Sequence, residues 1–183
     1  RFHDKDTGGL IYNQFITVKD KTYYIDDEGK PVKGLAVIKN TEYFFDKQKG
    51  TQIKGDFAVN GKYYDGITGA LVTNSYVRVG SDWYYVNSKG RRLKGAQIIN
   101  NVAVYFNPQN GKQLKGGFDE DGYFYDKDSG AKTDLGKNHY VQINDAWYYI
   151  GSEGKILKGE QTIDGVQVHF DTITGVQVKG NFI

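Results

Sequence analysis

The stretch NHYVQINDAWYYIGSEGKILKG, residues 138–159, decides the fold because the chain contains it three times. The other copies are NSYVRVGSDWYYVNSKGRRLKG at 74–95 and NQFITVKDKTYYIDDEGKPVKG at 13–34. A second kind of unit reads EYFFDKQKGTQIKGDF from Glu42, AVYFNPQNGKQLKGGF from Ala103 and QVHFDTITGVQVKGNF from Gln167. A third kind reads KYYDGITGALVTN from Lys62 and FYDKDSGAKTD from Phe124, and FHDKDTGGLIYN at Phe2 is a fragment of it. A fixed period of this kind is the signature of a repeat architecture.

Each unit is about 20 residues long, and three different units make a super-repeat of 61 to 64 residues. The super-repeats start near Asn13, Asn74 and Asn138, and both ends of the chain are out of phase with them. No boundary between globular domains is visible, so we expect one repeat domain over residues 1–183. The chain has no Met and starts abruptly at Arg1, which favours an excised piece of a longer protein. We expect this piece to be a monomer.

Apolar residues alternate with polar ones in each unit, which predicts half-buried β-strands. Residues 76–79 and 140–143 alternate with period two, and a polar link and a second strand follow at 83–86 and 147–150. Turns such as Asp27-Glu28-Gly29-Lys30 contain glycine because tight turns need a positive φ. One hairpin of this size is marginal alone and has to pack on the next. We therefore predict an all-β fold with essentially no helix: a solenoid of stacked β-hairpins.

Aromatic residues replace the usual aliphatic core in this prediction. The chain has 15 Tyr, 10 Phe and 2 Trp, and disordered chains are poor in such residues. Phe45, Phe106 and Phe170 occupy one aligned position and are predicted to be stacking core. The aligned pairs Ile16/Val18, Val77/Val79 and Val141/Ile143 are predicted core as well.

Composition excludes several classes of function. The formal net charge is +2, which is no electrostatic footprint for nucleic acid or for an anionic membrane. The absence of Cys excludes disulfides, Cys-ligated zinc and thiol catalysis. No apolar run approaches membrane-spanning length, so we expect no membrane insertion.

Catalysis and metal binding are not expected either, and no cofactor is implied. His3, His139 and His169 fall at non-equivalent positions, and no recognisable catalytic arrangement surrounds them. Asp4-x-Asp6-x-Gly8 and Asp126-x-Asp128-x-Gly130 faintly resemble a calcium loop, but the bidentate Glu is missing and a turn is the simpler interpretation.

The recurring chemistry is an aromatic ring accompanied by amides and ammonium groups. Alternation places Trp83 with Tyr85 on one face and Tyr84 with Val86 on the other, and the aliphatic Val86 marks the core side. Sugar rings pack C–H bonds on aromatic faces and need planar amide and ammonium partners for their hydroxyls.

The candidate sugar-binding residues are Trp83, Tyr84, Tyr85, Gln97, Gln113 and Lys115 in the second copy, and Trp147, Tyr148, Tyr149, Gln161, Gln177 and Lys179 in the third. A weaker first site consists of Tyr23, Tyr24, Gln52 and Lys54, where Thr22 replaces Trp and Ala36 replaces Gln. For a single Tyr, Gln or Lys, stacking core or solvated surface is the ordinary role.

AWYYIGSEGKILKG followed by EQTIDGVQVHFDTITGVQVKGNF resembles the YG-type glucan-binding repeats of domain V in glucansucrases of lactic acid bacteria and streptococci. Choline-binding repeats and clostridial toxin repeats are more distant relatives. The resemblance implies a non-catalytic, extracellular module that binds α-glucan such as dextran or isomalto-oligosaccharides. In the family a stacking Tyr combines with Gln and Lys, which implies Tyr84 or Tyr85 in the second copy and Tyr148 or Tyr149 in the third.

Three alternatives stay open at this point. The first is binding of choline or of cell-wall teichoic acid. Choline cages use two Trp and a Tyr from consecutive hairpins, whereas Trp83 and Trp147 belong to different super-repeats and are separated by several hairpins. A toxin-like receptor-binding module is a second alternative. A structural spacer with degenerate pockets is the third, and it requires no ligand at all.

Overall fold

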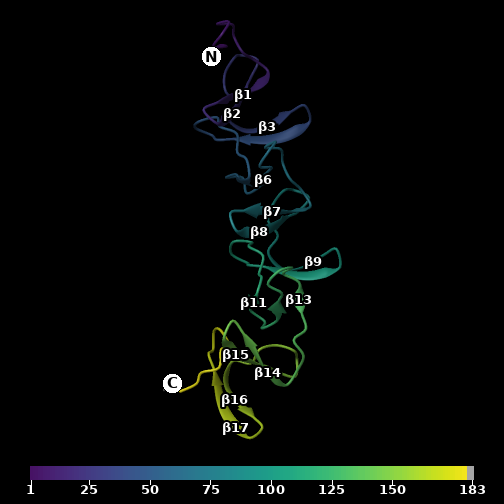
Figure 1. The fold of residues 1–183 in the computed structure, drawn as a ribbon. Coiled ribbons are helices and arrows are strands. Elements are labelled where there is room, and N and C mark those ends of the chain that lie inside the picture. Colours follow the sequence, from purple (N-terminus) through teal and green to yellow (C-terminus); the bar gives the residue numbers. More distant parts are fainter. Residues whose placement is uncertain (181–183) are drawn as a thin grey trace. The chain divides into compact units, whose positions relative to one another are not determined.

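The computed structural model describes residues 1–180, so Asn181 and Phe182 of the last predicted unit lie outside the described residues. Over that range the chain is a succession of β-hairpins with no helix (Figure 1), as the alternation predicts. Accordingly, no helix long and apolar enough to cross a membrane occurs among residues 1–180. The chain forms two compact units, Arg1–Leu93 and Lys94–Ile183.

Antiparallel pairs of short strands build both units. In the first unit the pairs are β1 (Gln14–Val18) with β2 (Lys21–Ile25), β3 (Gly34–Ile38) with β4 (Thr41–Phe45), β5 (Asp56–Phe57) with β6 (Tyr63–Tyr64), and β7 (Ser75–Val79) with β8 (Asp82–Val86). In the second unit they are β9 (Gly95–Ile99) with β10 (Val102–Phe106), β14 (His139–Ile143) with β15 (Ala146–Ile150), and β16 (Gly159–Ile163) with β17 (Val166–Phe170). The second unit also has one three-stranded sheet, β11 (Gly117–Phe118), β12 (Phe124–Tyr125) and β13 (Lys132–Thr133).

Two-residue loops set the register of the long hairpins. Lys19-Asp20 and Asn144-Asp145 both have positive φ at each residue, between 46° and 64°. Two successive positive φ values define the type I′ turn, whose twist matches that of the flanking strands. With the loop length fixed, Phe15 pairs with Tyr24 and Tyr140 pairs with Tyr149.

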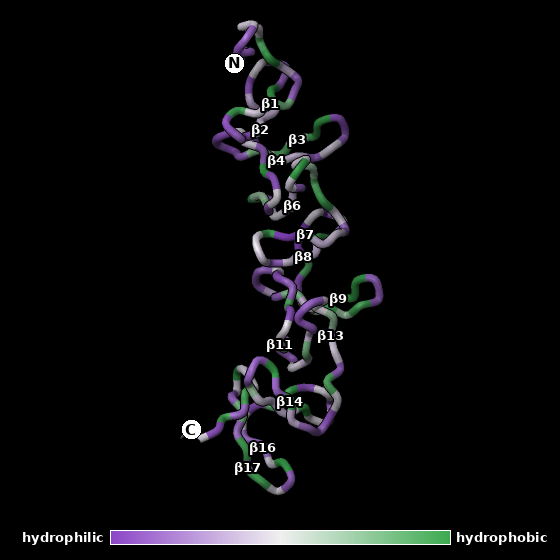
Figure 2. Tube along the Cα trace, viewed as in Figure 1, coloured by the Kyte–Doolittle hydropathy of each residue, from purple (hydrophilic) through white to green (hydrophobic). Residues whose placement is uncertain are grey.

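The core consists of aromatic and aliphatic residues from successive hairpins. Phe45, Phe106 and Phe170 are each 0% exposed, which confirms their predicted role. Ring contacts continue from one hairpin to the next: Phe57 of β5 lies 5.2 Å from Tyr84 of β8. Figure 2 shows short apolar stretches separated by hydrophilic turns along both units. This pattern is expected when successive hairpins bury their apolar residues against one another.

One part of the predicted core is less buried than expected. Val77 is 6% exposed, but Ile16, Val18, Val79, Val141 and Ile143 are only half-buried. Val18, Val79 and Ile143 end their strands next to the hairpin loop. A neighbour with strands of only two to five residues covers a narrow area, which leaves these end positions partly open to solvent.

Aspartate side chains stabilise the polar turns that separate the hairpins. Asp126 Oδ1 accepts backbone N–H groups from Asp128 at 3.1 Å and from Ser129 at 2.7 Å, and the Ser129 hydroxyl at 2.7 Å. The motif that faintly resembled a calcium loop is thus a turn closed by its own aspartate. These hydrogen bonds, above all the one from the Ser129 N–H, lower the pKa of Asp126 below its ordinary value of 3.8. The pKa values of Asp46, Asp65 and Asp171 are lowered in the same way.

Replacing Phe106 with Ala should lower the free energy of unfolding by about 3–5 kcal/mol, because a fully buried ring leaves a cavity. The matched control is Ile98→Ala on the same hairpin, since Ile98 is 77% exposed and its loss should change stability by no more than about 0.5 kcal/mol. Urea unfolding followed by tyrosine fluorescence measures both. Equal effects of the two substitutions would contradict the aromatic core.

Acid should destabilise the turns. A carboxyl whose pKa is lowered by folding contributes stability above its unfolded pKa, near 3.8, and that stability is lost as pH falls through the folded pKa. We therefore expect the stability of the wild type to fall below about pH 4. The variant Asp126→Asn keeps an oxygen acceptor without the charge, so its stability should depend less on pH in that range. Thermal unfolding across pH 2.5 to 6 tests this, and parallel pH profiles would refute it.

Candidate functional site

An aromatic pair lies across the two strands of each hairpin of the first kind. The ring centroids of Phe15 and Tyr24 are 4.9 Å apart and meet edge to face. The same geometry recurs at Tyr76–Tyr85, at 5.0 Å, and at Tyr140–Tyr149, at 4.9 Å. Because Phe15, Tyr76 and Tyr140 are each 36–40% exposed, every pair presents ring surface to solvent.

The neighbouring tyrosine of each hairpin packs inward instead. Tyr84 is 6% exposed and belongs to a core cluster with Tyr63, Val77 and Val86. Its counterpart Tyr148 lies 4.9 Å from the ring of Phe118. Trp83 and Trp147 are both 37% exposed, and Tyr85 and Tyr149 are half-buried. Burial thus separates Tyr84 from Tyr85 in the second copy, whereas Tyr148 and Tyr149 are both half-buried and differ in the ring that each contacts.

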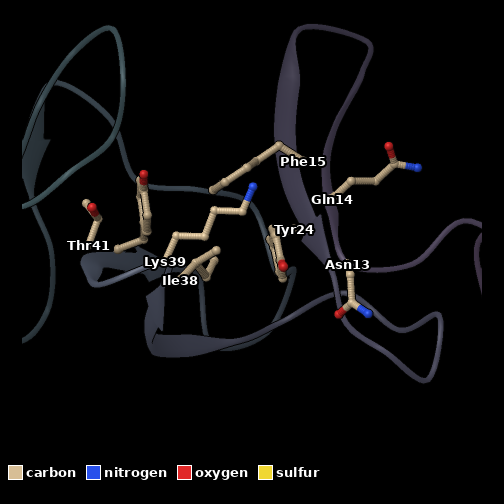
Figure 3. Close-up of a pocket in the computed structure, with 8 residues that line it drawn as sticks. Asn13, Gln14, Phe15, Tyr24, Ile38, Lys39 and Thr41 are labelled. Carbon is tan, nitrogen blue, oxygen red and sulfur yellow. The ribbon is translucent and has the colours of Figure 1, made fainter.

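A hollow of about 210 Å³ opens beside the first aromatic pair, between the hairpins β1–β2 and β3–β4. Its apolar lining consists of Phe15, Tyr24 and Tyr43, and the rings of Phe15 and Tyr43 are 5.2 Å apart. Lys39 and Thr41 line it from the second hairpin. Figure 3 shows the Lys39 side chain running toward Phe15 and Tyr24, while Gln14 points to the other side of its strand. We call this hollow the Phe15–Tyr24 pocket.

The Phe15–Tyr24 pocket combines ring surface with groups that form hydrogen bonds. The hydroxyls of Tyr24 and Thr41 donate and accept, and the Lys39 ammonium only donates. A few polar groups around a largely apolar floor are what fixes the orientation of a small polar ligand. The pocket is therefore suited to a flat molecule with C–H bonds on one face and hydroxyls at its edge.

Of the predicted weaker site, only Tyr24 lines this pocket. Gln52 and Lys54 hold the turn of the following unit: Gln52 Nε2 donates to the Thr68 carbonyl at 3.1 Å, and Lys54 Nζ donates to the Ile67 carbonyl at 3.1 Å. Tyr23, on the opposite face of its strand, is half-buried.

The second copy repeats this arrangement. Gln113 Nε2 donates to the Ser129 carbonyl at 3.3 Å, and Lys115 Nζ donates to the Asp128 carbonyl at 2.7 Å. Gly130 follows this turn with φ +71°, and a Cβ there would lie 2.4 Å from Gln113 Nε2. These first two Gln-x-Lys pairs thus clamp the turn of the following repeat.

In the third copy the Gln-x-Lys pair meets the predicted tryptophan. The Gln177 backbone N–H donates to the Trp147 carbonyl at 2.7 Å, and Lys179 Nζ lies 5.1 Å from the centre of the Trp147 ring. Tyr149 pairs with Tyr140. The amides of Gln97 and Gln161 donate to the carbonyls of Lys94 and Lys158.

Phe15, Tyr76, Tyr140, Tyr43, Lys39 and Thr41 were not singled out from the sequence. The signal for the first three was present, because a two-residue loop places Phe15 directly opposite Tyr24. Tyr43, Lys39 and Thr41 come from another hairpin, and no pattern within one hairpin gives the packing between two.

The three histidines have unrelated surroundings. His3 and His139 face backbone carbonyls, and His169 Nδ1 lies 2.8 Å from the carboxylate of Glu160. No group of three or more His, Asp or Glu residues that could hold a metal ion occurs within residues 1–180.

The family models for two repeats match the chain. "Putative cell wall binding repeat" matches residues 13–30, 74–91 and 138–156, which are the three hairpins that carry the aromatic pairs. "Choline-binding repeat" matches residues 32–76 and 93–134. The chain belongs to the choline-binding and cell-wall-binding repeat family.

Relatives of this cell-wall-binding repeat chain include streptococcal glucosyltransferases. Glucosyltransferase-S of Streptococcus mutans is 35% identical over 99% of this chain and 13% of the relative's length. Glucosyltransferase-S of Streptococcus downei is 34% identical over 90% of this chain and 13% of that protein. The chain therefore corresponds to the repeat portion of these enzymes and not to their catalytic part.

A solved structure shares the fold of these repeats. The modular autolysin LytC from Streptococcus pneumoniae aligns with 94% of this chain and 40% of its own, with a TM-score of 0.56 and 20% identity. At that identity the likeness concerns the arrangement of the hairpins alone.

The contact between Gln113 and the turn at Gly130 predicts that substitutions at these two residues have non-additive effects on stability. Gly130→Ala should destabilise the repeat chain by about 1–3 kcal/mol more than Gly95→Ala, because both glycines have a positive φ but only Gly130 faces a neighbouring side chain. Truncating Gln113 to Ala should cost less in the Gly130→Ala background than in the wild type. Chemical denaturation of the four proteins measures the coupling, and strictly additive effects would contradict the clamp.

Proposed function

We propose that the chain is a non-catalytic module that binds α-glucan, such as dextran or isomalto-oligosaccharides, through the solvent-facing aromatic pairs. The observation that carries the proposal is the Phe15–Tyr24 pocket, where ring surface, hydroxyls and one ammonium line the same hollow. The homology to the repeat portion of glucosyltransferases, enzymes that transfer glucosyl groups, supports a glucose polymer as the ligand.

A glucose unit fits the chemistry of this pocket. Its C–H face packs on the rings of Phe15 and Tyr24, and its hydroxyls reach the Tyr24 and Thr41 hydroxyls and the Lys39 ammonium. Tyr85 and Tyr149 supply the equivalent ring in the other two copies. In the third copy Trp147, Gln177 and Lys179 add a second group of the same character.

Several weak sites on one chain can together retain a polymer. A pocket with few contacts to one flexible sugar is expected to bind with about 4–6 kcal/mol, near the millimolar range. A polymer that reaches several pockets gains effective concentration, which raises avidity by about 10²–10⁴. The module would then retain a growing glucan near an attached enzyme, and we place that enzyme outside the cell or at its surface, where cell-wall-binding repeats act.

Choline is the second candidate, because one matching family model bears its name. The Phe15–Tyr24 pocket argues against it, since the Lys39 ammonium already runs toward the rings and would repel a quaternary ammonium. In addition, Trp83 and Trp147 belong to different super-repeats and not to consecutive hairpins, and both are 37% exposed. A spacer with degenerate pockets remains the alternative that predicts no ligand.

Affinity electrophoresis in gels that contain dextran tests the proposal. Dextran should retard the wild-type chain, and Tyr24→Ala should reduce the retardation because the ring that supports the sugar is lost. Tyr24→Phe, which keeps the ring, should retain most of it. Choline added to the gel should not compete with dextran.

The matched control is Tyr12→Ala, since Tyr12 is 56% exposed and does not line the Phe15–Tyr24 pocket. This variant should migrate like the wild type in dextran. Absence of retardation of the wild type would end the proposal, and release by choline would favour the second candidate. Circular dichroism of each variant establishes that a change in migration does not come from unfolding.

A further inference from the structure

The repeat is interrupted once, between the second and third super-repeats. The first two begin at Asn13 and Asn74, and equal spacing would start the third at Leu135, yet it starts at Asn138. The additional residues lie in the segment AKTDLGKN, residues 131–138, where the preceding copy reads ALVTN. There the chain forms β13, the third strand of the β11–β12–β13 sheet. The pairing of Lys132 with Tyr125 has its equivalent in the first unit, where Leu71 pairs with Tyr64, so the additional residues change the surface of the second compact unit just after this pairing.

In the first compact unit an ion pair between Lys62 and Glu42 occupies the equivalent position. Lys62 Nζ lies 2.9 Å from the carboxylate of Glu42, and the Tyr64 hydroxyl donates to that carboxylate at 2.8 Å. The Lys62 and Glu42 side chains are only 22% and 19% exposed. In the aligned positions of the second unit Ala103 replaces Glu42 and Tyr123 replaces Lys62. The Glu42–Lys62 ion pair is thus absent from this copy, where the Tyr125 hydroxyl donates instead to the buried carboxylate of Asp119 at 2.9 Å, and Ala103 and Tyr123 border a hollow.

That hollow has a volume of about 370 Å³ and is lined by Ala103, Tyr123, Lys132, Thr133, Asp134, Lys137, Glu153 and Gly154. We call it the β13 pocket. Lys132 Nζ lies 3.0 Å from the centre of the Tyr123 ring, and Lys155 Nζ lies 5.2 Å from the same point. Two ammonium groups therefore lie close to one aromatic ring.

Two lysines and two carboxylates line the β13 pocket, and Lys155 adds a third ammonium group beside it. Both of its carboxylates have partners: Glu153 pairs with Lys155 at 3.1 Å, and Asp134 Oδ1 accepts the Gly136 N–H at 2.8 Å. Lys132 and Lys137 form no ion pair with any residue in the range 1–180. A negatively charged ligand would give the ammonium groups of Lys132 and Lys137 a charged partner.

We propose that the β13 pocket binds the anionic group of an acidic saccharide, a carboxylate or a phosphate. Lys132 and Lys137 donate to the anion, the Thr133 hydroxyl donates or accepts at the sugar, and the edge of the Tyr123 ring supports it. The ammonium groups are exposed, so binding is weak and sensitive to salt. This site is independent of the Phe15–Tyr24 pocket and of the neutral glucan proposed there.

Backbone-amide NMR of the ¹⁵N-labelled chain tests the site with three probes: glucuronate, glucose 6-phosphate and glucose. At least one of the two acidic sugars should shift the amides of Tyr123, Thr133 and Gly154 and saturate in the millimolar range, while glucose leaves them unchanged. The two acidic probes distinguish carboxylate from phosphate. Raising NaCl from about 50 to about 500 mM should weaken the binding several-fold.

The variant Lys132→Leu should weaken binding of the acidic sugar about tenfold. It introduces the residue found at the aligned position of the first unit, Leu71, so the fold has a precedent for it. Lys89→Leu, at an exposed lysine of the first unit, is the control for net charge and should bind like the wild type. No shift with either acid, equal shifts with glucose, or unchanged affinity in Lys132→Leu would overturn the proposal. Shifts of Tyr24 and Thr41 with isomaltotriose report on the glucan site in the same samples.

Discussion

Burial of one aromatic residue between successive hairpins is the interaction on which this structure depends. A hairpin of two five-residue strands cannot exclude enough water from its own face to be stable. Phe45, Phe106 and Phe170 provide the burial that a single hairpin lacks, because each is completely buried at the end of its hairpin. Because Phe45 packs against Phe15 and Phe170 against Tyr140 of the preceding hairpin of the first kind, stability is a property of the series and not of a single repeat.

The same constraint creates the binding surface. A core filled by one face of each strand leaves the residues of the other face in contact with solvent, and in the first kind of hairpin those residues are aromatic. Tyr84 and Tyr85 are adjacent in the sequence, yet the first is in the core and the second is partly exposed beside Tyr76. Core positions and the positions proposed for recognition thus alternate along one strand, and repetition of the hairpin repeats both.

Period and pattern were enough to predict the hairpins, their turns and the buried phenylalanines, since these follow from alternation and from glycine at positive φ. They did not give the partners of Gln52, Gln113 and their lysines, which clamp the turn of the next unit. A Gln-x-Lys pair on one strand face has the same appearance in a sequence whether it meets a sugar or a carbonyl. Contacts between units depend on how hairpins pack, and Lys39 and Thr41 were missed for that reason.

The crystal structure of the chain soaked with isomaltotriose tests the central claim most directly. The account predicts electron density for a glucose ring with its C–H face against Phe15 and Tyr24 and its hydroxyls within hydrogen-bond distance of Lys39 or Thr41. Density found only away from the aromatic pairs, with the Phe15–Tyr24 pocket empty at a saturating sugar concentration, would contradict it.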